Sequence, residues 1–175
     1  MPDPDLAPDC SRCDALCCVL LAFDASDDFA LDKPACVACT HLARDNACRI
    51  HADLSIQGFK GCAVYTCYGA GQRISGQVFK DRLWRDDPTI MPAMEDAFRT
   101  LRNLHEAVWL LDQAARLNLT SDHEQRRQGI LSALDAGQDW TEATLHSLEQ
   151  SGALKAVRTF LATLRDLPEV KPPHR

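Results

Sequence analysis

The cysteine array decides how this chain folds, and it begins with CSRCDALCC at residues 10–18. It continues with CVAC at 36–39, CRIH at 48–51 and CAVYTC at 62–67. The chain has 175 residues and nine cysteines, all between positions 10 and 67. Two cysteines separated by two residues can turn both sulfurs toward one tetrahedral metal ion. One such pair is a weak signal, but two pairs with five further cysteines predict metal ligation.

All nine cysteines are therefore candidate metal ligands: Cys10, Cys13, Cys17, Cys18, Cys36, Cys39, Cys48, Cys62 and Cys67. Thiolates select soft or borderline ions, so zinc, an iron–sulfur centre or Cu(I) fit, whereas magnesium and calcium do not. Two four-thiolate zinc sites would leave one cysteine spare, and a three-metal cluster with bridging thiolates would use all nine. We expect about two or three zinc ions, with iron or an iron–sulfur cluster as the alternative.

Composition indicates a cytoplasmic protein. The first nine residues, MPDPDLAPD, are acidic and proline-rich, unlike a secretory signal. The longest apolar run, Ala15 to Phe23, has nine residues, far short of a membrane span of about 20. A net charge of −6 makes nucleic-acid binding an unfavourable hypothesis. In a reducing compartment an odd number of cysteines favours metal or thiol chemistry over disulfides.

The two parts of the chain differ in composition. Residues 1–70 hold ten Asp, no Glu and five Lys or Arg, a composition typical of turns and caps. Residues 71–175 hold fifteen acidic and fourteen basic residues, many Ala and Leu, and no cysteine. The sequence therefore predicts an irregular cysteine module followed by helices.

Helical periodicity begins at Pro92. The apolar stripe of this first helix comprises Met94, Ala97, Phe98, Leu101, Leu104, Val108, Leu111 and Ala115. A second helix is predicted from Ser121, in a capping box with Glu124, to near Gly137. A third begins after Asp139, with Glu142 three residues on, and Ser151 and Gly152 interrupt it. Its continuation runs to Pro168, before a frayed tail, KPPHR. A short strand is predicted at Gln77–Val78–Phe79.

The predicted fold class is mainly α, with an irregular, metal-stabilised cysteine-rich module followed by a domain of three or four helices. The predicted boundaries are residues 1–72 for the cysteine-cluster module, 73–91 for a connector, 92–167 for the helical domain and 168–175 for the tail.

These segments resemble the YkgJ-type cysteine-cluster family, described as zinc- or iron-chelating domains. The resemblance covers roughly residues 10–72 and rests on Cys17-Cys18, the segment CVACTHL from Cys36, the element CRIH from Cys48, and the closing Cys62 and Cys67. It departs from the family pattern at Cys36, at Thr40 and in the gap before Cys17. Residues 58–72 also resemble the cysteine module that precedes pentapeptide repeats in some bacterial proteins, although no repeats follow here. The resemblance implies metal binding and implies no reaction.

Three functions follow from the array as hypotheses. A structural or interaction role comes first, because a short, turn-rich module cannot bury enough apolar area alone. An enzyme with one open metal site comes second, with His51, Asp45 or Asp53 for acid–base chemistry, and no catalytic motif supports it. A redox or sensing role with an iron–sulfur centre comes third. His51 and His41 are expected in supporting positions rather than as ligands, since nine thiols already saturate two sites.

The helical part suggests a surface for a protein partner or for self-association. Trp109 beside Leu110 and Leu111 makes the apolar face wider than one stripe needs, although a broad core stripe explains it as well. His105 is expected at the edge of the buried face, and Arg126-Arg127 as a solvated basic pair.

Overall fold

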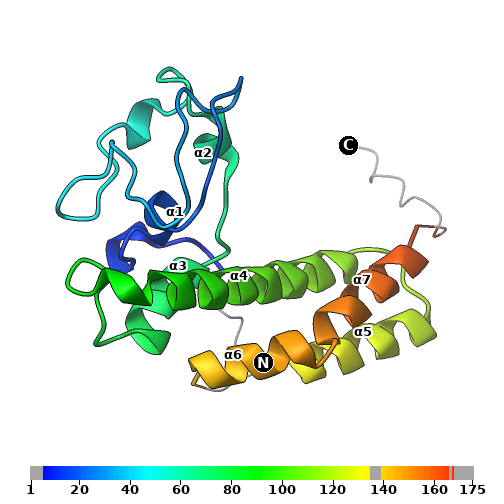
Figure 1. The fold of residues 1–175 in the computed structure, drawn as a ribbon. Helices are drawn as coiled ribbons and strands as arrows, with labels where there is room; N and C mark the ends of the chain where they lie inside the picture. The colour runs from blue at the N-terminus through cyan, green and yellow to red at the C-terminus, as the bar shows by residue number, and fades with distance from the viewer. Residues whose placement is uncertain (1–5, 135–138, 166, 168–175) are drawn as a thin grey trace. The chain divides into compact units, whose positions relative to one another are not determined.

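The computed structural model of the chain describes residues 6–134, 139–165 and 167. It divides into two compact units, residues 1–102 and 103–175. The described residues form seven α-helices and only two isolated β-bridges, Phe23 with Lys33 and Leu42 with Cys48, which confirms the mainly α fold class (Figure 1). The module boundaries at residues 72 and 92, drawn on composition, stay a prediction.

The first unit contains all nine cysteines and mostly short elements. Its helices are α1 (Leu16–Val19), α2 (Lys60–Val64), α3 (Ala70–Arg73) and the beginning of α4. Single turns of 3₁₀ helix lie at Cys10–Arg12, His51–Asp53 and Pro88–Ile90. The run Ala15 to Phe23 therefore forms one turn of helix, whose Leu16 and Val19 are completely buried.

The predicted strand at Gln77–Val78–Phe79 is wrong. Residues Ile74–Val78 form a π-helical turn that continues α3, and Phe79, which follows it, is buried. The apolar residues Ile74 and Phe79 are five apart, and the Phe79 N–H donates to the Ile74 carbonyl at 2.9 Å. The wider turn thus brings both side chains into the core of the first unit, which a strand with alternating faces would not do.

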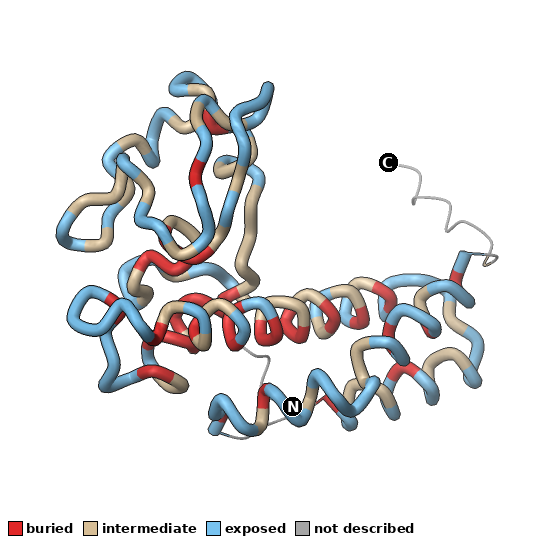
Figure 2. Tube along the Cα trace, viewed as in Figure 1, coloured by how far each residue is buried: buried red, intermediate tan, exposed pale blue. Residues whose placement is uncertain are grey.

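Helix α4 (Met91–Ala114) is the longest element and confirms the helix predicted from Pro92. The Asp87 carboxylate accepts from the Thr89 N–H at 3.0 Å and caps the turn Pro88–Ile90 that leads into it. Most of the predicted stripe is buried, as the red side of this helix shows in Figure 2, while Val108 is half-buried and Ala115 exposed. His105 is buried too, deeper than the helix edge predicted for it.

The second unit contains the end of α4 with α5 (Ser121–Leu134), α6 (Glu142–Gln150) and α7 (Ala153–Thr163). The predicted four-helix count from α4 onward is confirmed, and so is the break at Gly152, whose φ is +73°. Helix α7 packs against both α5 and α6. Gly137, Pro168 and the tail KPPHR lie outside the described residues.

The helix caps differ from those predicted. Thr120 caps α5, because its hydroxyl accepts from the His123 N–H at 3.3 Å, and Ser121 is already helical. Thr141 caps α6 in a capping box with Thr144, in place of Asp139 with Glu142. In both helices a threonine hydroxyl reaches the third backbone N–H, which is the bond a capping residue must make.

Candidate metal centre

The nine cysteines are all free thiols, and none of them is fully buried. Cys10 is exposed, and the other eight are half-buried. They come from separate short segments of the first unit, so their proximity depends on the loops between them. Four non-glycine residues of the described chain have positive φ, and Cys36 is one of them: Ala15, Cys36, Asn46 and Tyr68.

Gly71 marks the place where two cysteines approach the backbone of α3. A Cβ built on Gly71 would lie 2.7 Å from Cys13 Sγ and 3.8 Å from Cys67 Sγ. Real Cβ atoms essentially never come as close as 2.7 Å to another heavy atom, so only glycine leaves room for the Cys13 sulfur here. Cys10 joins this region through the turn that ends when the Cys13 N–H donates to the Cys10 carbonyl at 3.4 Å.

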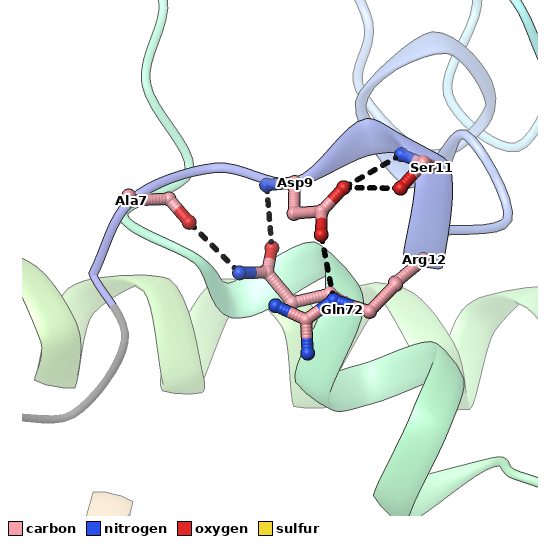
Figure 3. A network of polar contacts seen from close by, with 5 residues as sticks. All are labelled: Ala7, Asp9, Ser11, Arg12 and Gln72. Carbon is pink, nitrogen blue, oxygen red and sulfur yellow. Dashed lines mark hydrogen bonds and ion pairs between the residues drawn. The ribbon is translucent and has the colours of Figure 1, made fainter.

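The turn that carries Cys10 and Cys13 is held by a buried glutamine from α3 (Figure 3). Gln72 donates to the Ala7 carbonyl at 2.8 Å and accepts from the Asp9 N–H at 3.1 Å. The Asp9 carboxylate accepts from the Ser11 N–H and from Arg12 Nε, and the Ser11 hydrogen bond is the main reason why the pKa of Asp9 is lowered. The approach to the first two cysteines is therefore fixed by side-chain hydrogen bonds.

Cys17 and Cys18 lie on α1 with their sulfurs 4.0 Å apart. Two sulfurs on one tetrahedral zinc ion would lie about 3.8 Å apart, given zinc–sulfur bonds of about 2.3 Å. The pKa of Cys17 is raised, first by its hydrogen bond with Cys18 and then by burial. In the absence of a positive ion these two thiols therefore resist ionisation.

The Cys36–Cys39 segment packs along α1 through its backbone. The Cys39 N–H donates to the Cys18 carbonyl at 2.9 Å, and the Cys36 N–H donates to the Leu20 carbonyl at 3.2 Å. Cys36 itself turns toward α4, where its sulfur donates to Glu95 Oε2 at 3.7 Å. Burial, then the Glu95 charge, raises the pKa of Cys36.

A buried lysine lies beside this segment. Lys33 is 3% exposed, and its ammonium donates to the carbonyls of Val19 at 2.9 Å, Pro34 at 3.1 Å and Leu21. Burial lowers its pKa, while four nearby thiols act in the opposite direction: Cys39, Cys18, Cys36 and Cys17. The ammonium thus places one positive charge inside the cysteine-rich region.

Burial is the main reason why three other thiols also resist ionisation. It raises the pKa of Cys13 to about 11 and that of Cys62 to about 11, and it raises the pKa of Cys10. Repulsion from neighbouring thiols adds to this effect at Cys62 from Cys17, Cys39 and Cys48, and at Cys10 from Cys17, Cys67 and Cys48. The sulfurs of these separate segments therefore lie close enough for their charges to interact.

Tyr65 adds a buried hydroxyl to the same region. Its oxygen is inaccessible and makes no hydrogen bond within the part of the chain that the structure describes. Burial raises the pKa of this phenol, the Arg102 guanidinium over its ring at 5.8 Å lowers it, and the nearby Cys17 and Cys67 raise it further. A buried hydroxyl without a partner carries a desolvation penalty, which an anionic acceptor beside it would remove.

The sulfurs converge in pairs rather than in larger sets. Within residues 6–134, 139–165 and 167, no group of three or more His, Cys, Asp or Glu side chains meets in a way that would hold a metal ion. The two histidines of the array play other parts, since His41 packs edge-on against Phe59 at 5.1 Å and His51 is exposed. Asp45 and Asp53, the candidate acid–base residues, are exposed as well.

Four residues of this region escaped the sequence analysis: Lys33, Tyr65, Gly71 and Glu95. Lys33 had a signal, because it is the only lysine among the first 59 residues. Gly71 had a weaker one, as a glycine soon after the last cysteine. Tyr65 and Glu95 had none, because their roles depend on contacts that only the folded chain makes.

The comparisons with known proteins leave the family open. The chain is similar to the uncharacterized protein YybG of Bacillus subtilis (strain 168), with 40% identity over 115 residues, which cover 66% of this chain. The match spans about two fifths, 41%, of that relative's length. No protein-family model matches the chain, and no solved structure matches it.

A membrane-spanning helix is absent from the described residues, because none of their helices combines the necessary length with sufficient hydrophobicity.

Proposed function

We propose that the first unit is a metal-binding module in which cysteine thiolates hold zinc, in a structural or interaction role. The observation that carries the proposal is the set of nine free thiols, gathered from separate segments into one unit and near enough to interact electrically. The resemblance of residues 10–72 to YkgJ-type cysteine-cluster proteins supports it. Free thiols also suit a reducing compartment, so we propose the cytoplasm.

The donor set fits a soft or borderline ion. Only sulfur is plentiful in the region, and the separation of the Cys17 and Cys18 sulfurs, 4.0 Å, is close to the edge of a zinc tetrahedron. The hydroxyl of Tyr65 and the ammonium of Lys33 are placed to face negative charge. A bound zinc ion would favour the thiolate form of its ligands, which burial and mutual repulsion otherwise disfavour.

A folding role follows from the way this unit is built. Its loops contain the two isolated bridges, and four non-glycine residues adopt the left-handed conformation, which costs about 1–2 kcal/mol for each. Metal–thiolate bonds in small modules contribute folding free energy directly, because the unfolded chain has no preformed site. We therefore propose that zinc stabilises the loops between Cys10 and Cys67.

The test is metal content per chain, together with the absorption spectrum of protein purified anaerobically. Colourless protein with about two or three zinc ions supports the proposal. A brown protein with visible charge-transfer bands supports the alternative, an iron–sulfur centre on the same cysteines with a redox or sensing role. Metal-free protein with four disulfides overturns both.

An interaction role would use the helical unit. Trp109, on α4, is 38% exposed, and Leu117 in the following loop is 42% exposed, which is unusual for side chains this large. We propose that this surface binds a protein partner or a second copy of the chain. Light scattering of the full chain and of Trp109→Ser tests self-association, since a monomer at every concentration would exclude the second copy.

A further inference from the structure

Resting on the proposed zinc-binding function, we propose that eight of the nine thiols form two separate zinc sites and that Cys36 is the spare thiol. The first site comprises Cys10, Cys13, Cys17 and Cys67. The second site comprises Cys18, Cys39, Cys48 and Cys62. The odd number of cysteines then has a definite meaning, because the ninth thiol has another partner.

The first site is built around Gly71. Cys13 and Cys67 approach the same point of the α3 backbone, where a Cβ would lie 2.7 Å and 3.8 Å from their sulfurs. Cys10 shares a hydrogen-bonded turn with Cys13 and lies within electrostatic range of Cys67. Three sulfurs from two distant segments are thus brought to one side of α3.

Cys17 completes this set. It lies within electrostatic range of Cys10 and of Cys13. The hydroxyl of Tyr65, which makes no hydrogen bond in the described part of the chain, lies near both Cys17 and Cys67. A thiolate ligand is a good acceptor for that buried hydroxyl, so the orphaned donor points to negative charge on this side of the cluster.

The second site is built along the other side of α1. The Cys39 N–H is bonded to the Cys18 carbonyl, and the bridge between Leu42 and Cys48 brings the next segment alongside. Cys62 lies within electrostatic range of Cys39 and Cys48. Cys17 and Cys48 are also in range of the opposite set, so the two sites are close neighbours.

Charge favours the second set too. Four thiolates around one divalent zinc ion carry a net charge of about −2, which is unfavourable inside a protein unless a cation lies nearby. The buried Lys33 ammonium acts on Cys18 and Cys39, and its own hydrogen bonds to three carbonyls hold it in place.

Cys36 is separated from both sets by its partner. Its sulfur donates to the Glu95 carboxylate at 3.7 Å, which needs the protonated thiol, whereas a zinc ligand must be a thiolate. A carboxylate beside a thiolate would also repel it. Although Cys36 has the two-residue spacing to Cys39, its side chain is directed at α4.

Zinc stoichiometry of the full chain tests this division, with three variants: Cys13→Ser, Cys62→Ser and Cys36→Ser. We expect about half of the wild-type zinc in the first two variants and an unchanged content in the third, because each site needs four ligands. The Cys13→Ser, Cys62→Ser double variant should bind none. Cobalt substitution, which gives a thiolate charge-transfer band, shows whether the remaining site keeps four sulfurs.

Each outcome separates the two proposals. Wild-type protein without metal refutes the proposed function itself. Loss of all metal in either single variant, while wild-type protein is loaded, shows one shared cluster and refutes the division into two sites. Loss of half the metal in Cys36→Ser shows that Cys36 is a ligand and refutes its assignment as the spare thiol.

A glycine pair tests the first site without removing a ligand. Gly71→Ala adds a methyl group 2.7 Å from Cys13 Sγ, whereas Gly76→Ala in the following turn meets nothing within 4 Å. We expect Gly71→Ala to weaken the first site about tenfold or more and to leave the second unchanged. Equal zinc affinities of Gly71→Ala and Gly76→Ala at both sites would overturn the placement of the first site.

Discussion

The two units of the chain fill their interiors in different ways. Residues 6–102 bury Lys33, Gln72 and Ser75 among apolar side chains, and their backbone runs mostly through turns and single helical turns. In residues 103–167 the interior consists mainly of helix-borne apolar groups such as Leu111 and Phe160, both completely buried. Helices satisfy their own backbone groups, whereas the loops of the first unit depend on side chains and, we propose, on metal.

The polar groups of the first unit show what holds its loops. Ser75 Oγ accepts from the Asp14 N–H at 2.9 Å, and Trp84 donates to the Asp14 carbonyl at 2.8 Å. Arg85 reaches the Ala43 carbonyl at 3.0 Å and Asn46 at 2.9 Å. Each bond fixes one loop at one point, so the unit is a set of tethered segments with the thiols among them.

Removing the metal should have the largest effect, and it should be confined to the first unit. Chelation under reducing conditions is expected to release the amides of Cys36 and Cys39 to rapid hydrogen exchange, because the loops that carry them lose their cross-links. The amides of α7 should stay protected, since that helix packs through Val157 and Phe160. Equal protection in both units before and after complete metal removal would contradict a folding role for the metal.

Leu111→Ala is expected to have the opposite pattern. Leu111 is completely buried on α4 in the second unit, and removing a buried leucine side chain costs about 3 kcal/mol of unfolding free energy. Denaturant unfolding followed by hydrogen exchange should show the loss in the helical unit, with zinc content unchanged. Leu110→Ala, at a half-buried neighbouring position, is the matched control and should lose less.

Lys33→Met tests the polar interior of the first unit. The substitution keeps an unbranched side chain but leaves the carbonyls of Val19, Leu21 and Pro34 without their donor, which costs about 2 kcal/mol. Zinc affinity should fall as well, because a positive charge next to thiols is lost. Lys80→Met, at an exposed position of the same unit, is the control. A Lys33→Met protein as stable as the control would show that those carbonyls find other donors.

The helical unit was the more predictable part of the fold, since apolar spacing and Gly152 mark its helices and their break. Individual contacts were less predictable. Arg127, expected on a solvated face with Arg126, is 6% exposed and donates to the Glu124 carboxylate and to the Leu111 carbonyl. One basic residue of the pair points inward because the helix turns about 100° per residue, and the sequence of α5 has too thin an apolar face to show which one.

The candidate site was predictable in its ligand types and not in its arrangement. Cysteine spacing predicts which residues can share an ion, but loops without periodicity bring Cys67 beside Cys13 and direct Cys36 to Glu95. The supporting residues are harder still, because Tyr65 and Gly71 matter only through distances to sulfurs from other segments.

The smallest effect is expected from the Glu124–Arg127 ion pair, and it should depend on pH. Hydrogen bonds from Arg127 and then Gln128 lower the pKa of Glu124 from its ordinary 4.5 to about 2. A carboxyl with a lowered pKa contributes stability above its ordinary value and loses that contribution as the pH falls through the folded value. The helical unit of wild-type protein should therefore lose stability between about pH 4.5 and pH 2.

Glu124→Gln should remove this pH dependence and little else, because the Glu124 side chain is 42% exposed and solvent screens the pair. The indole N–H signal of Trp140, a buried residue of the same unit, reports its unfolding separately from the metal site. Asp122→Asn, at an exposed position in the same turn of α5, is the control and should keep the wild-type slope. A slope in Glu124→Gln as steep as that in wild type would mean that the acid sensitivity of the helices comes from other carboxyl groups, and that Arg127 is held inside mainly by its bond to Leu111.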